Sequence, residues 1–129
     1  MKQENRNLRI ELMNVLYQYD LYASSNLSFI PSFEVEEASP IFQQIIEHIQ
    51  EIDEIIESNL FEYSLSRLAF VDRAIIRLAV YELKFTDLAK QIIINEAVEI
   101  TKIYSNLDDQ KQHKFTNRVL DNIAKTIKG

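Results

Sequence analysis

Glycine is almost absent from this sequence, because the single glycine is Gly129, the last residue. Hairpin turns, phosphate-binding loops and sharp strand connections mostly need residues that reach positive φ, and glycine does so at the least cost. The sequence therefore predicts an all-helical fold. It also excludes a dinucleotide-binding fingerprint and a P-loop, since both motifs require internal glycines.

The composition is that of a folded globular chain. Of the 129 residues, 47% are hydrophobic and 26% are charged, which suits one compact domain spanning residues 1–129. The absence of cysteine excludes disulfides, thiolate zinc sites and cysteine nucleophiles. The sequence starts without the apolar segment of a secretory signal, and no later stretch is long and uncharged enough to span a bilayer. We therefore expect a cytoplasmic protein without membrane contacts.

Apolar residues recur at helical spacing in five segments. The pattern predicts helices over about 5–23, 40–58, 70–84, 90–104 and 113–127, joined by mostly short connections into a helical bundle. The segment 70–84 is apolar on most sides, so we expect it to be the central helix. Ser39 is predicted to cap the second helix, with Pro40 in its first turn. Whether this second helix is straight or broken stays open.

Polar residues at 24–26 interrupt the first helical pattern, and no sustained period follows them up to Ser39. This region is predicted to be a loop or short turn. Its apolar residues Phe29, Ile30 and Phe33 are expected to cover the core from that loop.

The charge of the chain is unevenly distributed. The formal net charge is −6, but residues 23–70 alone carry nine acidic residues and one basic residue, Arg67. Residues 71–129 have a net charge of +2, and the last helical segment has five cations, of which Lys128 is the final one, against one acid, Asp121. A positive end therefore coexists with a negative middle, which keeps nucleic acid among the expected partners.

The sequence lacks the spacing of a catalytic or metal site. His48 is flanked by Glu47 and Glu51, but neither the two-histidine metalloprotease spacing nor the Glu-x-x-His di-iron spacing occurs. We interpret His48 and the glutamates at 47, 51, 54 and 57 as the water-facing side of their helix. The prediction is a non-enzymatic protein without cofactor or metal.

One segment combines the residue types that hold unpaired RNA. Lys114 and Arg118 are cations suited to phosphates, Phe115 offers a ring for stacking, and Asn117 has an amide that can read base edges. Arg6 and Arg9 form a similar cationic pair on the first helix. The alternative stays open that Phe115 belongs to the core and that the cations only balance the acidic middle.

Four sequence blocks, in this order, strongly resemble the NusB family. They are VLYQYD at 15–20, VDRAIIRLAVYEL at 71–83, INEAVEITK at 94–102 and HKFTNRVLD at 113–121. The resemblance implies an all-α, single-domain bundle of about six or seven helices. It also implies a factor of transcription antitermination and termination that binds single-stranded boxA RNA of nascent ribosomal RNA. Its implied partners are the ribosomal protein NusE and the antitermination complex of RNA polymerase.

The same resemblance implies two groups of site residues. The RNA contacts are expected at Arg6, Arg9, Lys114, Phe115, Asn117 and Arg118. The surface near RNA and NusE is expected at Tyr17, Asp72, Arg73, Tyr81 and Glu82. The acidic segment 23–70 has two open interpretations, because it would attract a basic ribosomal protein and would equally serve solubility.

The chain departs from the family pattern at three places. Only Arg6 and Arg9 remain of the usual arginine cluster at the start, Arg118 replaces the glycine that usually follows Asn117, and Asn106 is expected to supply a left-handed helix cap in place of glycine. Two alternatives therefore stay open. One is a protein-interaction or homodimerising bundle with weak RNA binding, and the other is an RNA-binding domain that serves a cytosine-5 RNA methyltransferase in trans.

Overall fold

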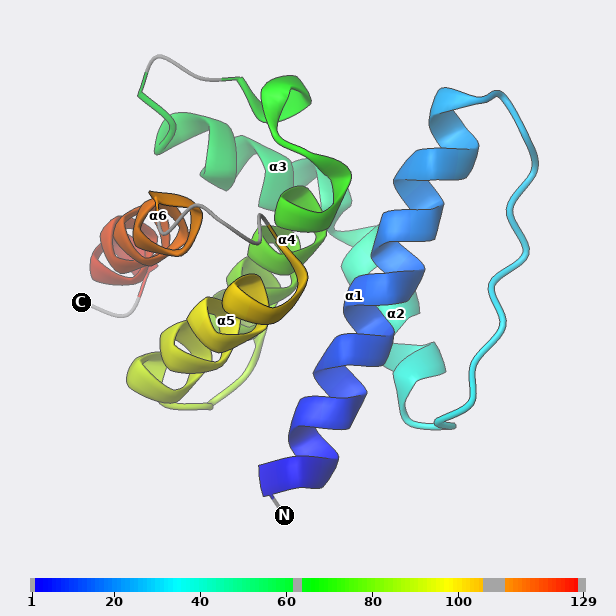
Figure 1. Ribbon diagram of the computed structural model, residues 1–129, viewed down its shortest axis with the longest axis horizontal. Coiled ribbons are helices and arrows are strands. Elements are labelled where there is room, and N and C mark those ends of the chain that lie inside the picture. Colours follow the sequence, from blue (N-terminus) through cyan, green and yellow to red (C-terminus); the bar gives the residue numbers. More distant parts are fainter. Residues whose placement is uncertain (1, 62–63, 106–110, 128–129) are drawn as a thin grey trace.

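The computed structural model describes residues 2–61, 64–105 and 111–127. Within these ranges the chain forms six α-helices, one short 3-10 helix and no strand (Figure 1). The prediction of an all-helical bundle of about six or seven helices is confirmed. No helix of the described ranges combines the length and apolar character needed to cross a bilayer. The elements are α1 (Lys2–Ser24), α2 (Ala38–Glu47), α3 (Ile49–Ser58), η1 (Leu65–Arg67), α4 (Phe70–Phe85), α5 (Lys90–Tyr104) and α6 (Lys111–Ile127).

Helix α4 is the centre of the molecule. Every residue from 74 to 83 is buried, and α4 contacts all five other α-helices of the described chain. Figure 1 shows α1 and α2 on one side of α4, and α5 and α6 on the other. A helix without a polar face needs neighbours all around it, so the predicted central position is confirmed.

Helix α1 ends where the polar residues 24–26 predict an interruption. Asn26 has a φ of 56°, the left-handed region that commonly closes a helix. The backbone amides of Ser25 and Leu27 donate to the carbonyl oxygen of Tyr22, at 3.1 and 3.0 Å. Asparagine tolerates this conformation better than most residues, so the chain ends α1 without a glycine.

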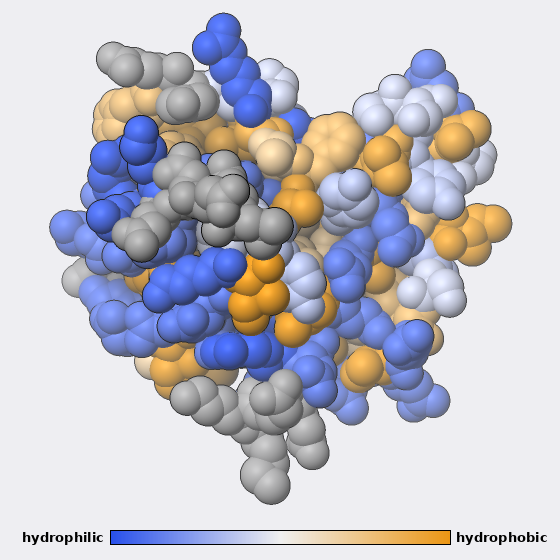
Figure 2. Space-filling view, in the orientation of Figure 1, coloured by the Kyte–Doolittle hydropathy of each residue, from blue (hydrophilic) through white to orange (hydrophobic). Residues whose placement is uncertain are grey.

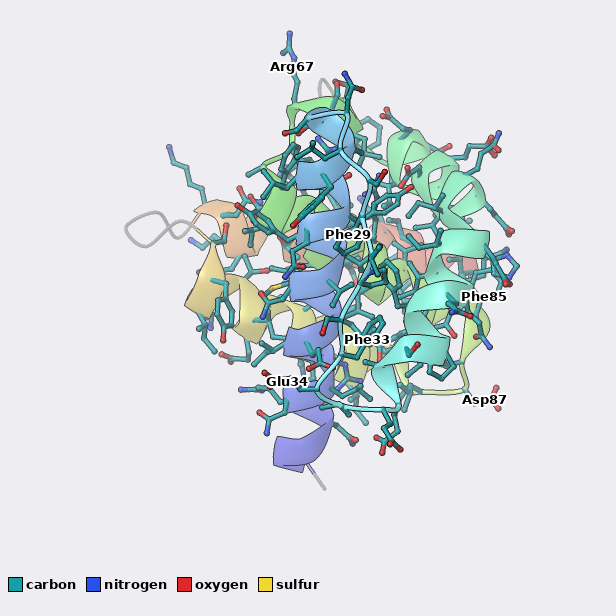
Figure 3. All side chains as sticks on the ribbon, turned by 90° about the vertical axis from the view of Figure 1, so that its right-hand side faces the viewer. Phe29, Phe33, Glu34, Arg67, Phe85 and Asp87 are labelled. Atoms are coloured by element: carbon teal, nitrogen blue, oxygen red, sulfur yellow. The ribbon has the colours of Figure 1, made fainter. Side chains whose placement is uncertain are left out.

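The segment after Asn26 runs beside α1 (Figure 3). Phe29 and Phe33 pack against Phe42 of α2, with ring centroids 6.4 and 5.8 Å apart, as predicted. The prediction that Ile30 also covers the core is wrong, because its side chain is 88% exposed. Exposure alternates from residue 29 to residue 34, as expected when successive side chains of an extended segment point to opposite sides.

The second predicted helix is broken into α2 and α3 at His48, whose φ and ψ are −106° and 14°. The imidazole of His48 stacks on Phe85 of α4 at a centroid distance of 4.4 Å, so this residue packs on α4 and is only half-exposed. The four glutamates at 47, 51, 54 and 57 are exposed, as predicted. No group of three or more potential metal ligands occurs in the part of the chain that the structure describes.

The predicted helix cap at Ser39 is wrong. Helix α2 begins at Ala38 after Glu37, and no side chain caps it. The amides of Ala38 and Ser39 donate to the carbonyls of Val35 and Glu36, so a backbone turn starts the helix one residue before the predicted cap. Pro40 still lies in the first turn, where the backbone amide that it lacks would have no helical partner.

The two remaining helices match their predicted segments. Helix α5 spans Lys90–Tyr104 as expected, and α6 begins two residues earlier than predicted. One face of α6, formed by Val119, Leu120, Ile123 and Ala124, is buried, while Lys114 and Arg118 on the opposite side are exposed. The predicted cap at Asn106 lies outside the described residues.

Candidate nucleic-acid interface

The start of α6 and the connection before α4 form a cleft of about 590 Å³, which we call the basic cleft. Lys114 and Arg118 lie one turn apart on α6, and the guanidinium of Arg118 is 5.9 Å from the centroid of the Phe115 ring. Phe115 is half-buried, so part of its ring remains at the surface. Among the residues that the structure describes, the basic cleft is lined by four cations, one carboxylate and four uncharged residues: Arg67, Leu68, Ala69, Asp72, Lys111, Gln112, Lys114, Phe115 and Arg118.

A second cavity, of about 620 Å³, lies between α1, α5 and α6. It brings Arg6 together with Asn117, which is one turn from Lys114 on α6, so the two hollows are neighbours along that helix. Its other charged residues are Glu96, Glu99 and Lys102 of α5, which balance the charge of Arg6. Figure 2 shows hydrophilic residues gathered over α5 and α6 on this side of the molecule.

Arg6 is positioned by a bidentate ion pair with Glu96. Its Nε and Nη2 donate to Oε1 and Oε2 of Glu96, at 3.0 and 2.6 Å. The hydrogen bond with Glu96 is the largest influence on Arg6 and raises the pKa of its guanidinium. The side chain of Arg6 remains 24% exposed, so it reaches the surface next to Asn117.

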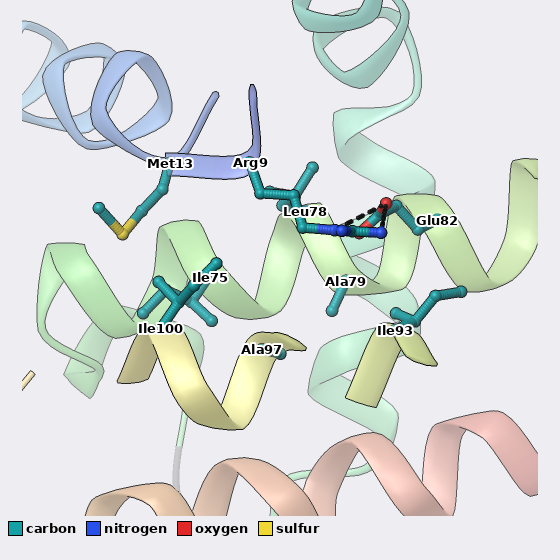
Figure 4. Close-up of a pocket in the computed structure, with 9 residues that line it drawn as sticks. All are labelled: Arg9, Met13, Ile75, Leu78, Ala79, Glu82, Ile93, Ala97 and Ile100. Carbon is teal, nitrogen blue, oxygen red and sulfur yellow. Dashed lines mark hydrogen bonds and ion pairs between the residues drawn. The ribbon is translucent and has the colours of Figure 1, made fainter. Parts of the chain in front are cut away.

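Arg9 lies beneath this surface and is only 7% exposed. Its Nε donates to both carboxylate oxygens of Glu82, each at 3.1 Å (Figure 4). Its Nη1 lies 3.8 Å from Oε1 of Glu96. Burial raises the pKa of the Glu82 carboxyl, and the hydrogen bond from Arg9 opposes this rise. Arg9 therefore joins α1 to α4 and α5, and its predicted contact with RNA stays a prediction.

Two of the residues predicted for the partner surface meet at the N-terminal end of α4. The rings of Tyr17 and Phe70 make an edge contact at 6.3 Å, and the guanidinium of Arg73 lies 5.0 Å from the centroid of Phe70. Arg73 also pairs with Asp20 of α1 at 3.4 Å. Tyr17 is partly exposed, whereas the side chain of Arg73 is only 13% exposed, so the surface here is mainly aromatic.

The other three predicted partner residues are buried and lie in two places. Asp72 accepts a hydrogen bond from the hydroxyl of Ser105, and burial raises the pKa of its carboxyl. Tyr81 donates to the side chain of Gln44 and stacks on Phe85, and burial raises its pKa. Tyr81 and Glu82 are about ten residues, or roughly 15 Å of helix, from Asp72. The five residues therefore do not form one continuous surface.

Three site residues were not predicted from the sequence: Arg67 and Lys111 of the basic cleft, and Glu96 beneath Arg6. Arg67 was visible as the single base of an acidic segment, but nothing in the sequence placed it opposite Lys111 and Lys114. Glu96 holds both Arg6 and Arg9, and sequence spacing gives no signal for pairing between residues about ninety positions apart.

The chain matches the NusB family over residues 6–125. The chain belongs to the NusB family. A transcription antitermination protein NusB from Nitratiruptor is 39% identical, with 93% of this chain and 91% of the relative covered. The corresponding protein of Bacillus subtilis is 35% identical, with 96% of this chain and 97% of the relative covered.

Solved structures of the family share the fold. NusB of T. maritima superposes with a TM-score of 0.78 at 32% identity, over 93% of this chain and 89% of that chain. A chain in a crystal structure of the antitermination factors NusB and NusE with dsRNA has a TM-score of 0.76 at 31% identity. That match covers 98% of this chain and 99% of the other.

Proposed function

We propose that this member of the NusB family is a non-enzymatic transcription antitermination factor that binds single-stranded boxA RNA together with NusE. The observation that supports this most is the convergence of Lys114, Phe115 and Arg118 on one cleft, with Asn117 and Arg6 beside it. The similarity to a chain in a structure of NusB, NusE and dsRNA supports the same class of partners.

Each exposed residue has a chemical role in this proposal. Lys114, Arg118 and Arg6 neutralise phosphates, the exposed part of Phe115 stacks on a base, and Asn117 contacts a base edge or a sugar. Arg9 supports this surface from below, because it holds Glu96, the carboxylate that positions Arg6. Since few cations face the RNA, we expect modest affinity without a partner protein.

NusE is proposed to bind near the surface formed by Tyr17, Phe70 and Arg73. This surface lies at the N-terminal end of α4, where Asp72 borders the basic cleft, so a partner there would lie beside the RNA. The exposed acids of α3 supply negative charge that would attract a basic protein. The assembled pair would then join the antitermination complex of RNA polymerase.

The test is a titration of labelled single-stranded boxA RNA with the chain alone and with the chain plus NusE. It is done at about 50 mM and about 200 mM salt, because phosphate contacts weaken as salt rises. We expect the pair to bind more tightly than either protein alone, and a scrambled RNA of equal length to bind more weakly. Absence of binding by the pair at low salt would refute the proposal.

Light scattering on the same samples tests the homodimer alternative. A monomer that gains the mass of NusE and RNA agrees with the proposal. A dimer whose mass is unchanged by both partners would instead support a homodimerising bundle.

A further inference from the structure

We propose that Arg67 on η1 binds a phosphate of the same RNA strand, so that the strand crosses the basic cleft between η1 and α6. This inference rests on the proposed function, and it adds a contact from the connection between α3 and α4. The expected RNA surface would then include an internal segment as well as the two ends of the chain.

Arg67 lies on the side of the basic cleft that faces α6. It is the single cation of residues 23–70, and the fold places this one cation at the basic cleft, with Lys111, Lys114 and Arg118. Figure 3 shows its side chain extending away from the body of the molecule. Cations from two elements therefore border one cleft, which suits a phosphate backbone better than a single row of charges would.

The backbone that carries Arg67 is held by hydrogen bonds and by buried side chains on both sides. The amide of Leu65 donates to Oε1 of Glu57 at 2.7 Å, and Leu65 and Leu68 are 7% and 8% exposed. Nη2 of Arg73 donates to the carbonyls of Ser66 and Leu68, at 3.3 and 3.2 Å. An exposed cation on a fixed turn loses less backbone entropy on binding than one on a loose loop.

The described residues that line the cleft favour a polyanion. Four of them are cations, and the acid among them, Asp72, is 7% exposed and accepts a hydrogen bond from Ser105. Apolar lining comes from Leu68, Ala69 and Phe115, and the cleft volume lies within the range of small-ligand sites, large enough for a nucleotide unit.

The test compares R67Q and R67E with the control K90E, using labelled single-stranded boxA RNA and the full chain with NusE. Lys90 is an exposed cation at the start of α5, about 21 Å of helix from Tyr104, the residue before the Ser105 that bonds Asp72 of the cleft. We expect R67Q to weaken binding roughly tenfold and R67E to weaken it further. R67Q should also lower the slope of log affinity against log salt by about 0.7, the value for one phosphate of a single strand. K90E should stay within about twofold of the unmodified chain.

The outcomes separate this inference from the proposed function. If the unmodified chain and K90E both fail to bind RNA, the proposed function itself is wrong. If the unmodified chain binds and both Arg67 variants match it in affinity and salt slope, only the inference is overturned. Weaker NusE binding by R67E without RNA, at unchanged RNA affinity, would assign the cleft to a protein and overturn the inference as well.

A crosslinking measurement gives an independent answer. Because the sequence contains no cysteine, an aryl azide attached to the R67C variant reports on that position alone. We expect light to crosslink R67C to the RNA and to leave an equally labelled K90C variant without a crosslink. Equal crosslinking by the two variants, or none by R67C while RNA is bound, would contradict the inference.

Discussion

At the scale of single residues, the buried ion pair between Arg9 and Glu82 joins α1 to the central helix. Both side chains are largely removed from water, at 9% and 12% exposure, so each charge depends on the other. Replacing one partner leaves the other charge buried with only a more distant counter-charge. The resulting loss of folding free energy is larger than the contribution of a surface ion pair.

We expect E82A to lower the free energy of unfolding by about 3 kcal/mol, because Arg9 would keep only its longer contact with Glu96. Urea denaturation measures this loss. The control is K84A on the same helix, which removes an exposed pair with Glu51 and should change stability by less than about 1 kcal/mol. Equal stability of the two variants would contradict the assigned role of Arg9.

A second buried carboxyl, Asp72, predicts a dependence of stability on pH. Burial raises its pKa above the ordinary value of 3.8, so the folded protein keeps this proton at pH values where the unfolded chain has lost it. The stability due to the neutral carboxyl is present below the ordinary pKa and is lost as pH rises through the raised pKa.

The variant D72N stays neutral and keeps an oxygen that accepts the hydrogen bond from Ser105. We therefore expect D72N and the unmodified chain to have similar stability near pH 4, and D72N to gain relative stability as the pH rises to about 7. Denaturation at a series of pH values measures this difference. A difference that stays constant, or that shrinks with rising pH, would show that Asp72 is not held as described.

At the scale of elements, the end of α1 depends on one residue in a left-handed conformation. Asn26 occupies that position at a φ of 56°. A β-branched residue is strained there by about 1–2 kcal/mol, whereas glycine is not.

Thermal unfolding of N26V and N26G should therefore give changes of opposite sign. We expect N26V to lower the free energy of unfolding by about 1–2 kcal/mol, and N26G to raise it by a few tenths of a kcal/mol. The matched pair S25V and S25G controls for general effects of these substitutions. Destabilisation by both Asn26 variants would contradict the assigned conformation.

The elements differ in how far the sequence predicts them. In α4 and α5 the apolar residues recur at helical spacing, on most sides of α4 and on one face of α5. The bounds of both helices could therefore be predicted from the sequence. The break between α2 and α3 was not, because the apolar stripe continues through His48 and the break depends on its stacking against Phe85, far away in sequence. The start of α2 was mispredicted because a backbone turn, rather than the hydroxyl of Ser39, begins it.

At the scale of the whole molecule, the candidate interface is assembled from charges that are distant in sequence. Arg9 lies three and four residues before the buried Leu12 and Met13, so its inward direction could have been predicted from the helical period. The pairing of Arg9 with Glu82 and Glu96 depends on how α1 packs against α4 and α5. The approach of Arg67 to α6 likewise depends on how the helices pack. The sequence therefore predicted the residue types of the interface better than their pairing.

Binding of single-stranded RNA at the start of α6 is tested by comparing K114E with K125E in an RNA titration with NusE. Both lysines are exposed on α6, but Lys125 is about three turns from Lys114 and about two turns beyond Arg118, and it pairs with Asp121. We expect K114E to weaken binding by roughly tenfold or more with a smaller salt slope, and K125E to stay within about twofold of the unmodified chain. Equal RNA affinity of the two folded variants would contradict RNA binding at this site.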